Sequence, residues 1–479
     1  MFNRHVSKLL TNLISNRSIH TTRNKCKEFE NPILRTLRIL REDFTRLQGP
    51  SENDIERERA LMGVFPRHAD VVIIGGGAIG SSIAYWLKEK TSKEGIRVVV
   101  IEKDMTYSKC TTLLSAGGLH QQFSLPENVQ LSLYGAEFLR TLKKRFGPGA
   151  DIQYCPQGHL ILADEEGAQR IIDNNFIERE LGVINQILTK NQLQQKFPWM
   201  NVTDVELACL GLEKHGWFDP WALLSVVRYG AAHLGAQYVE GEVVDFLFRD
   251  SEEYIGEGMD DNPYKAVNEV VVKMPDGEHK TMEFAFCVIA AGLQSSELAQ
   301  LAKIGTGSGM LSVRLPIEKR DRYVFSFDCP ESPPGINTPM TVDHSGLYFR
   351  RNGLGGSFIA GVSPCDDAEL SLDEYFRDKV CPVLQNRVPA FSSIKVKNSW
   401  RGSYEHNGFD DSGIIGPHPY YHNLYLATGF SGFGIQQAPA IGRAAAELIL
   451  DGDFKTIDLT RFGFDRLIVD KPMYETTVV

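Results

Sequence analysis

The hydrophobic pattern of the chain is clearest where a run of β-branched residues changes abruptly to glycine. Residues 71–74 read Val-Val-Ile-Ile and are followed by three glycines. A short, continuous apolar run of this kind is typical of a buried parallel strand. A helical apolar period and a second β-branched run come next. The pattern predicts a strand at 70–74, a helix at 79–89 and a strand at 97–102.

Alternation of apolar and polar positions predicts further strands and helices along the chain. Ser124-x-x-Glu127, with Pro126 between them, has the form of a capping box and predicts a helix that runs to Gly147. Residues 311–361 alternate between turn signals and look antiparallel. The other predicted elements are strands over 152–163, helix and loop over 165–200, a helix from Pro220, strands at 237–247, 268–273 and 282–289, a loop at 250–261 and a helix at 439–450.

The glycines after the first strand have the spacing Gly75-x-Gly77-x-x-Gly80 of a dinucleotide-binding fingerprint. The first glycine permits a tight turn, the second lets the backbone approach a pyrophosphate, and the third allows the helix to pack closely on the strand. The phosphates then bind free N–H groups at the start of the helix, around Ala78 and Ile79. An ordinary turn is the plainer alternative, but the flanking strand and helix argue against it.

Two more observations define the nucleotide. Glu102 ends the second strand, where a carboxylate can accept hydrogen bonds from ribose hydroxyls and disfavours NADP. Buried runs also end in small residues at 290–292 and 427–429. A flavin lies across the sheet and needs close backbone approach at several strand ends, so FAD is favoured over NAD. The start of the helix predicted at 439–450 could stabilise negative charge on a reduced flavin.

These elements predict an α/β fold, with a discontinuous Rossmann-type FAD-binding domain and an antiparallel-sheet (α+β) substrate domain. The 479 residues suffice for two domains with their own cores. A membrane span over 69–87 is the alternative for the glycine-rich stretch, but that stretch holds Asp70 and changes period midway. The predicted segments are 69–150, 215–305 and 395–460 for FAD, 151–214 and 306–394 for substrate, and a C-terminal tail at 461–479.

The first 27 residues differ in composition from the rest. They hold six basic residues and no acidic one, and are rich in Ser, Thr and Asn. This is the signature of a mitochondrial transit peptide, with a disordered basic tail as the alternative. Residues 28–68 are interpreted as an N-terminal helical leader. We therefore expect the protein in the mitochondrion, in the matrix or on the matrix face of the inner membrane.

Charge and cysteine spacing exclude other classes of protein. The net charge is −10 although the start of the chain is basic, so the body is acidic and nucleic acid is an improbable partner. The eight cysteines never lie closer than 16 residues apart. That spacing excludes CxxC-type metal or redox motifs and provides no disulfide framework, so no metal site is expected.

Taken together, the motifs resemble the FAD-dependent D-amino-acid-oxidase superfamily, specifically its sarcosine and dimethylglycine dehydrogenase branch. The resemblance covers about 69–455 and rests on the glycine fingerprint, Ser115–Gly118, Ala290–Gly292, Trp400-x-Gly402 and Ala427–Gly434. It implies an oxidoreductase whose substrate cavity lies on the flavin face, beneath the antiparallel sheet. The FAD-binding positions predicted are Gly75, Gly77, Ala78, Ile79, Gly80, Glu102, Ser115, Gly117, Gly118, Val243, Ala291, Gly292, Gly429, Phe430, Ser431, Gly432, Phe433 and Gly434.

Departures from the family pattern are informative. Dimethylglycine dehydrogenases attach flavin through a histidine where this chain has Ser115, and sarcosine oxidases through a cysteine near Gly402. FAD should therefore be held non-covalently. Amino-acid oxidases clamp the substrate carboxylate with an arginine where this chain has Ser403-Tyr404. The family's Thr-Pro-Asp is likewise replaced, by Asn407-Gly408-Phe409-Asp410.

The candidate catalytic residues are Tyr348, Arg350, Tyr404 and His120. Tyr348 and Arg350 share one face of a predicted strand, so Arg350 could clamp a carboxylate bidentately in place of the missing arginine. An arginine on an exposed strand face is the commoner situation. His120 could act as a base, although a lone histidine is more often a packing residue. The tyrosines could equally be core aromatics.

The resemblance is tightest to mitochondrial members of the family that are associated with assembly of respiratory complex I (NADH:ubiquinone oxidoreductase). It implies complex I subunits or assembly intermediates as partners, with peripheral association at the inner membrane. One alternative is a matrix dehydrogenase that oxidises an N-substituted amino acid by hydride transfer to FAD, with a small-molecule amine or amino acid as substrate. The other is a non-catalytic scaffold with structural FAD.

Overall fold

The computed structural model describes residues 65–92, 95–251, 264–362 and 370–477. The predicted transit peptide, most of the helical leader and most of the loop at 250–261 lie outside these ranges. Within the described part of the chain, no helix has both the length and the apolar composition needed to cross a bilayer.

The first sheet carries the glycine fingerprint. Its strands follow the order β17-β18-β11-β1-β2-β8, and β9 and β10 extend from β11 as an antiparallel pair. β1 pairs in parallel with both β2 and β11, so its β-branched side chains are covered on both faces. The bounds are β1 (His68–Ile74), β2 (Val98–Glu102), β8 (Gln237–Glu240), β9 (Glu242–Ser251), β10 (Tyr264–Lys273), β11 (His279–Ile289), β17 (Ile414–His418) and β18 (Tyr421–Thr428).

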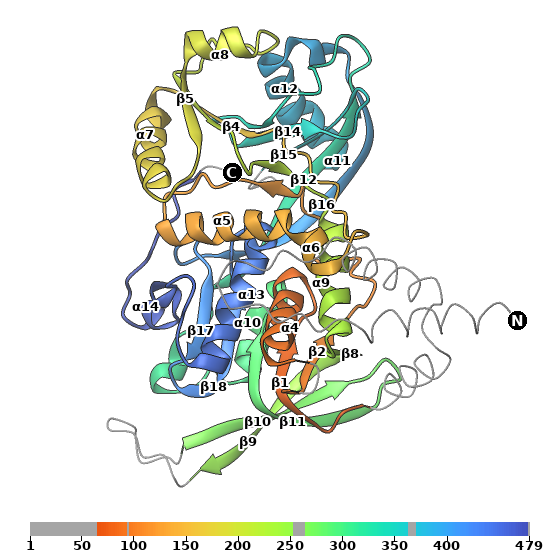
Figure 1. Cartoon of the computed structure of the whole chain (residues 1–479), viewed down its shortest axis with the longest axis vertical. Helices are drawn as coiled ribbons and strands as arrows, with labels where there is room; N and C mark the ends of the chain where they lie inside the picture. Colours follow the sequence, from red (N-terminus) through yellow and green to blue (C-terminus); the bar gives the residue numbers. More distant parts are fainter. Residues whose placement is uncertain (1–64, 93–94, 252–263, 363–369, 478–479) are drawn as a thin grey trace, which may run out of the picture. The chain divides into compact units, whose positions relative to one another are not determined.

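Helices cover the first sheet on its two faces (Figure 1). One core lies beneath α4, α5, α9 and α13, and a separate core lies beneath α10. A Cβ at Gly442 of α13 would lie 2.5 Å from the backbone of Ser82 in α4, so glycine is what lets these two helices touch. The bounds are α4 (Ala78–Thr91), α5 (Pro126–Arg140), α6 (Leu142–Phe146), α9 (Pro220–His233), α10 (Ser295–Leu301), α13 (Gly434–Asp451) and α14 (Asp465–Ile468).

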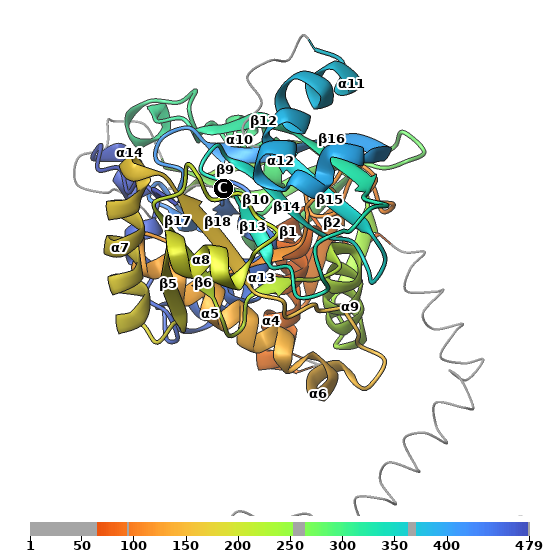
Figure 2. The ribbon, with the colours of Figure 1, turned by 90° about the horizontal axis from the view of Figure 1, so that it is seen from above.

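The second sheet follows the order β16-β12-β15-β14-β13-β4-β6-β5 and is antiparallel except where β13 meets β4. Helices α7, α8 and α12 lie next to this sheet, as Figure 2 shows from above. A two-stranded sheet of β3 and β7 completes the strands. The bounds are β3 (Gly118–Leu119), β4 (His159–Ala163), β5 (Asn185–Thr189), β6 (Leu207–Gly211), β7 (Gly216–Trp217), β12 (Ile317–Asp328), β13 (Met340–Val342), β14 (Leu347–Arg351), β15 (Ser357–Val362), β16 (Lys395–Asn407), α7 (Glu165–Glu180), α8 (Lys190–Lys196), α11 (Leu372–Tyr375) and α12 (Cys381–Arg387).

The second sheet corrects three sequence predictions. Residues 185–189 form β5 instead of helix or loop, and only the end of 152–163 forms a strand. Residues 395–407, assigned to the FAD-binding segments, form β16 and pair with β12 along their whole length. Long-range pairing decides these elements, because short strands carry little periodicity of their own.

Two helix starts also differ from prediction. Ser124 does not cap α5; its hydroxyl donates to the Glu475 carboxylate, which also accepts the N–H groups of Ser124 and Leu125. A distant acid therefore replaces the predicted capping box. Helix α13 begins at Gly434 and carries Pro439 in its interior. The proline loses one backbone hydrogen bond, but burial of α13 against α4 and α5 keeps the helix continuous.

Candidate functional site

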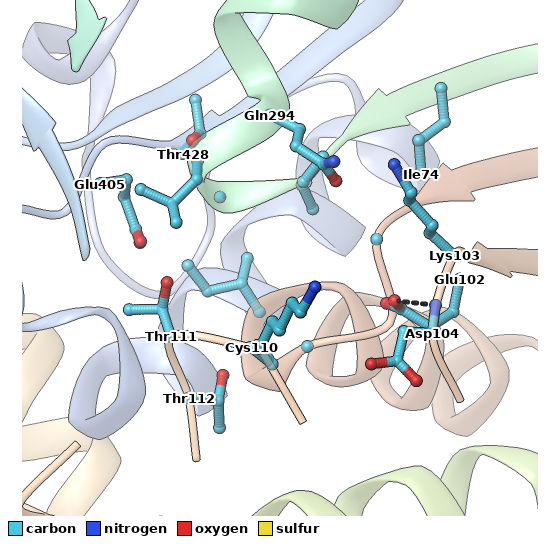
Figure 3. Close-up of a pocket in the computed structure, with 18 of the residues that line it drawn as sticks. Ile74, Glu102, Lys103, Asp104, Cys110, Thr111, Thr112, Gln294, Glu405 and Thr428 are labelled. Carbon is cyan, nitrogen blue, oxygen red and sulfur yellow. Dashed lines mark hydrogen bonds between the residues drawn. The ribbon is translucent and has the colours of Figure 1, made fainter. Parts of the chain in front are cut away.

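A cavity of about 1030 Å³ lies along the carboxyl ends of the parallel strands of the first sheet. β1, β2, β11 and β18 each contribute residues at or just after their last position, among them Ile74 and Thr428. Ligands of open α/β sheets bind at this edge. The volume is at the upper end of the range of roughly 300–1,000 Å³ for small-molecule sites, as a dinucleotide requires. Figure 3 shows Glu102 and Asp104 grouped at one end, with Thr111, Glu405 and Thr428 at the other.

The glycine fingerprint forms the floor of the nucleotide end. Gly75 has φ +102°, and a Cβ there would lie 2.4 Å from the Ala290 carbonyl oxygen. A Cβ at Gly80 would lie 1.9 Å from the Gly75 carbonyl oxygen, so this glycine serves helix packing and does not line the cavity. Gly77 is the N-cap of α4 and has no side-chain cap. The Ala78 N–H donates to Thr112 Oγ1 at 3.3 Å, and the N–H groups that follow it in the first turn of α4 can bind phosphate.

Glu102 is held at the tip of β2 by the backbone. One carboxylate oxygen accepts the Gly76 N–H at 2.7 Å, and the other accepts the Asp104 N–H at 3.0 Å. The carboxylate still lines the cavity and has acceptor capacity left for ribose hydroxyls. Sequence reasoning missed the loop 103–112, most of which also lines this end. The position of that loop, between a strand end and Ser115–Gly118, was the available signal.

The predicted FAD-binding residues divide into two groups. Those that line the cavity are Gly75, Gly77, Ala78, Ile79, Glu102, Ser115, Val243, Ala291, Gly292, Gly432 and Gly434. The others lie behind its wall and shape the backbone or pack beneath it. This second group is Gly80, Gly117, Gly118, Gly429, Phe430, Ser431 and Phe433.

Helix α13 starts at the flavin end of the cavity. Gly434 and Ile435 line the cavity, and no side chain caps the helix. The sequence predicted this helix start five residues later, so the positive end of the helix lies closer to the glycine-rich motif than expected. Such an end stabilises negative charge next to it.

Glu405 is the principal residue that sequence reasoning missed. It lies on β16, is 7% exposed and lines the cavity. One of its carboxyl oxygens has no hydrogen-bond partner within the described part of the chain. Cβ atoms placed on Gly292 or Gly434 would lie 3.6 Å from its carboxyl oxygens, which locates the group at the flavin end. Burial raises the pKa of Glu405, against the opposing effects of its hydrogen bonds and of the positive charge of Arg322.

Arg350 and Tyr348 do not line this cavity, contrary to prediction. Arg350 is buried and donates from Nε to the Ala116 carbonyl oxygen and from Nη1 to the Arg351 carbonyl oxygen, both at 2.9 Å. Burial lowers the pKa of Arg350 to about 10. The guanidinium therefore braces the 115–118 loop. Tyr348 packs in an apolar cluster with Trp217.

His120 belongs to a buried group of three histidines. Its ring stacks on His159 at 4.4 Å and on Phe123 at 4.6 Å, and it meets Phe433 edge-on. Burial lowers the pKa of His120 to about 3 and that of His215 to about 3, so these rings are neutral at pH 7. The packing interpretation of His120 therefore agrees with the geometry better than a role as a base.

Tyr404, also predicted to face the cavity, does not line it. The side chain is buried, and the Arg322 guanidinium carbon lies 4.0 Å from its ring centroid. Arg322 was not among the sequence candidates. It lies on β12, and the pairing of β12 with β16 brings it next to Tyr404.

Comparison with known proteins identifies the family. The family model described as "FAD dependent oxidoreductase" matches residues 70–448. The FAD-dependent oxidoreductase domain-containing protein 1 homolog of Drosophila melanogaster is 45% identical over 96% of this chain and 95% of its own length. The FAD-dependent oxidoreductase domain-containing protein 1 of Xenopus laevis is 46% identical over 86% of this chain and 85% of its own.

Among solved structures, L-proline dehydrogenase from P. horikoshii superposes with a TM-score of 0.70 at 23% identity, covering 85% of this chain and 100% of its own. That likeness concerns the fold. The family match spans most of the chain and includes every strand end that lines the cavity. The chain therefore belongs to the FAD dependent oxidoreductase (DAO) family, and its cofactor is FAD.

Proposed function

We propose that this flavoprotein oxidises a small amine or amino acid at the flavin end of the cavity, and that it acts in mitochondria during assembly of respiratory complex I. The observation that supports the proposed oxidation is the set of groups that line the flavin end of the cavity. A purely structural cofactor needs only a cavity that fits it, whereas here the uncapped start of α13 and the buried carboxyl group of Glu405 both line the flavin end. When bound, FAD supplies a two-electron acceptor.

Different residues serve the two ends of the cavity. The start of α4 binds the pyrophosphate, and Glu102 orients a ribose. The start of α13 stabilises negative charge at the other end. Glu405 presents to this end a carboxyl oxygen that has no hydrogen-bond partner in the described part of the chain. The second sheet reaches this end through Glu405 of β16, the strand that pairs with β12.

The name of the structural neighbour L-proline dehydrogenase, a protein that acts on a secondary amine, supports the choice of amine chemistry. The test is anaerobic mixing of the FAD-loaded full chain with L-proline and a panel of N-methyl amino acids. We expect at least one to bleach the flavin absorbance. If none does, although dithionite reduces the flavin, the hypothesis of a non-catalytic scaffold replaces that of an enzyme.

The assembly role is supported by the resemblance described above and by the basic, acid-free first 27 residues. Two measurements test it. A reporter fused to residues 1–27 should enter mitochondria, and diffuse cytosolic signal would reject that location. Cells that lack the protein should accumulate incomplete complex I, and the full chain should restore the complete form. Complex I intermediates that co-purify with the chain would identify its partners.

A further inference from the structure

Two buried polar atoms line the same end of the cavity without a hydrogen-bond partner in the described part of the chain. They are Oε2 of Glu405, on β16, and Oγ1 of Thr428, the last residue of β18. Glu405 is 7% exposed and Thr428 is 1% exposed. Figure 3 shows both residues at one end of the cavity, together with Thr111. Because a buried polar atom without a partner is costly, this end is suited to a ligand that supplies hydrogen bonds.

A short loop connects this polar group to the phosphate-binding start of α4. A Cβ on Gly77 would lie 3.5 Å from Sγ of Cys110 and 3.4 Å from Oγ1 of Thr112. Thr111 lies between these two residues in the chain, and its side chain hydrogen-bonds the Glu405 carboxyl group. The carboxyl group is therefore next to the site of the diphosphate, with only Thr111 between them.

Glu405 lies on the side of the diphosphate site that faces away from Glu102. Figure 3 shows the two acids at opposite ends of the cavity, and Glu102 is the residue placed to hold the ribose of the adenosine half. Cβ atoms on Gly292 and on Gly434, the first residue of α13, would lie 3.6 Å from the carboxyl oxygens of Glu405. In FAD the diphosphate joins adenosine to the ribityl chain, and the ribityl chain carries the ring. The part of FAD next to the diphosphate on this side is therefore the ribityl chain, which bears hydroxyl groups along its length.

The chemistry of the unpartnered atoms also matches hydroxyl groups. A hydroxyl both donates and accepts, so it can pair with the Glu405 carboxyl group whether that group is ionised or neutral. The same hydroxyl, or its neighbour on the chain, can donate to or accept from Thr428. Diphosphate oxygens carry negative charge and repel an ionised carboxylate, so they are poorer partners.

We infer that Glu405 and Thr428 bind hydroxyl groups of the ribityl chain of FAD, and that Thr111 positions the carboxyl group. None of these three residues was among the FAD-binding positions predicted from the sequence. The inference concerns the cofactor, which the family match establishes, and does not depend on the proposed oxidation. With Glu405 bound to the ribityl chain, the start of α13 is the group left to act on the ring.

The test measures cofactor affinity and needs no turnover. The full chain without its cofactor is titrated with FAD and with FAD analogues that each lack one ribityl hydroxyl, and flavin fluorescence is recorded. We expect at least one analogue to bind the wild type roughly tenfold more weakly than FAD. Glu405→Met, which keeps the length of the side chain, should bind FAD roughly tenfold more weakly and should no longer distinguish FAD from that analogue. Glu405→Gln should keep most of the affinity, and Thr428→Val should lose a few-fold.

Glu318→Met is the matched control. It removes an acid from β12, the strand paired with β16, but Glu318 is exposed and does not line the cavity. This variant should bind FAD and every analogue like the wild type. Urea unfolding of each protein without cofactor separates weakened binding from weakened folding.

Three results would overturn the inference. The first is a wild type that binds every ribityl analogue as tightly as FAD. The second is a penalty for the missing hydroxyl that persists in Glu405→Met, or that disappears equally in Glu318→Met. The third is an analogue methylated at the ring N3 whose penalty, instead, is the one that Glu405→Met removes, because the carboxyl group would then bind the ring. Each result leaves the bleaching of the flavin by amines as a separate question.

Discussion

The two ends of the cavity are built in different ways. At the nucleotide end, Gly75, Gly77 and Glu102 come from one βαβ unit, and the contacts are largely made by backbone. At the flavin end, Thr111, Gly292 and Glu405 come from three segments that are distant in sequence. Binding of the nucleotide is therefore encoded locally in this protein, whereas the surroundings of the flavin end depend on long-range strand register.

The largest effect is expected at the nucleotide end, from Gly75→Ala. The new Cβ would lie 2.4 Å from the Ala290 carbonyl oxygen, at a φ that L-residues rarely adopt. We expect the free energy of unfolding to fall by at least about 3 kcal/mol, together with loss of FAD. Urea unfolding of the apoprotein measures the first effect independently of the second. Wild-type stability in this variant would mean that the turn is looser than the structure shows.

Gly77→Ala separates binding from folding. A Cβ here meets only ordinary contacts, at 3.4 Å from Thr112 and 3.5 Å from Cys110, so the apoprotein should keep its stability. The methyl group nevertheless lies where the backbone must approach the pyrophosphate. FAD affinity should fall about a hundredfold, which corresponds to about 2.7 kcal/mol. Fluorescence titration of the apoprotein with FAD measures this loss, and unchanged affinity would contradict the assignment of the phosphate site.

Acid should destabilise the protein through its buried histidines. Burial lowers the pKa of His120 to about 3, so the unfolded chain binds more protons than the folded one between that pH and the ordinary value near 6.5. Stability contributed by the neutral ring is present above pH 6.5 and is lost as the pH falls. From pH 7 to pH 5 we expect a loss of about 2 kcal/mol from this residue.

The matched variant for the acid effect is His120→Phe, which keeps an aromatic ring in the stack with His159. Its unfolding free energy should depend less on pH than that of the wild type. Equal pH slopes for the two proteins would show that His120 is not a buried neutral base.

A smaller effect is expected from Arg350→Met. This variant distinguishes a residue that supports the 115–118 loop from one that binds a substrate carboxylate. Loss of the hydrogen bond to Ala116 should destabilise the 115–118 loop by about 1–2 kcal/mol and weaken FAD binding modestly. Carboxylate binding to the FAD-loaded variant, followed in the flavin absorption spectrum, should be unchanged. A selective loss of carboxylate binding in Arg350→Met would support the carboxylate clamp that the sequence suggested for this residue.

Much of this protein is determined by its local sequence. The β-branched runs, the glycine spacing and the acid at the tip of β2 predicted the βαβ unit and most of the wall at the nucleotide end, because a strand, a turn and a helix start are specified by neighbouring residues. Alternation also correctly placed Tyr348 and Arg350 within a strand. What it does not specify is the surroundings that such a side chain meets.

Only the tertiary structure decided those surroundings. The pairing of β12 with β16 stacks Arg322 on Tyr404, and the same register turns Glu405 toward the cavity. Glu475 replaces the capping box of α5 from the far end of the chain. In each case the deciding contact joins residues that are far apart along the chain. Periodicity records which face of an element is buried, but the free energy of burying a charge depends on the partner that folding brings to it.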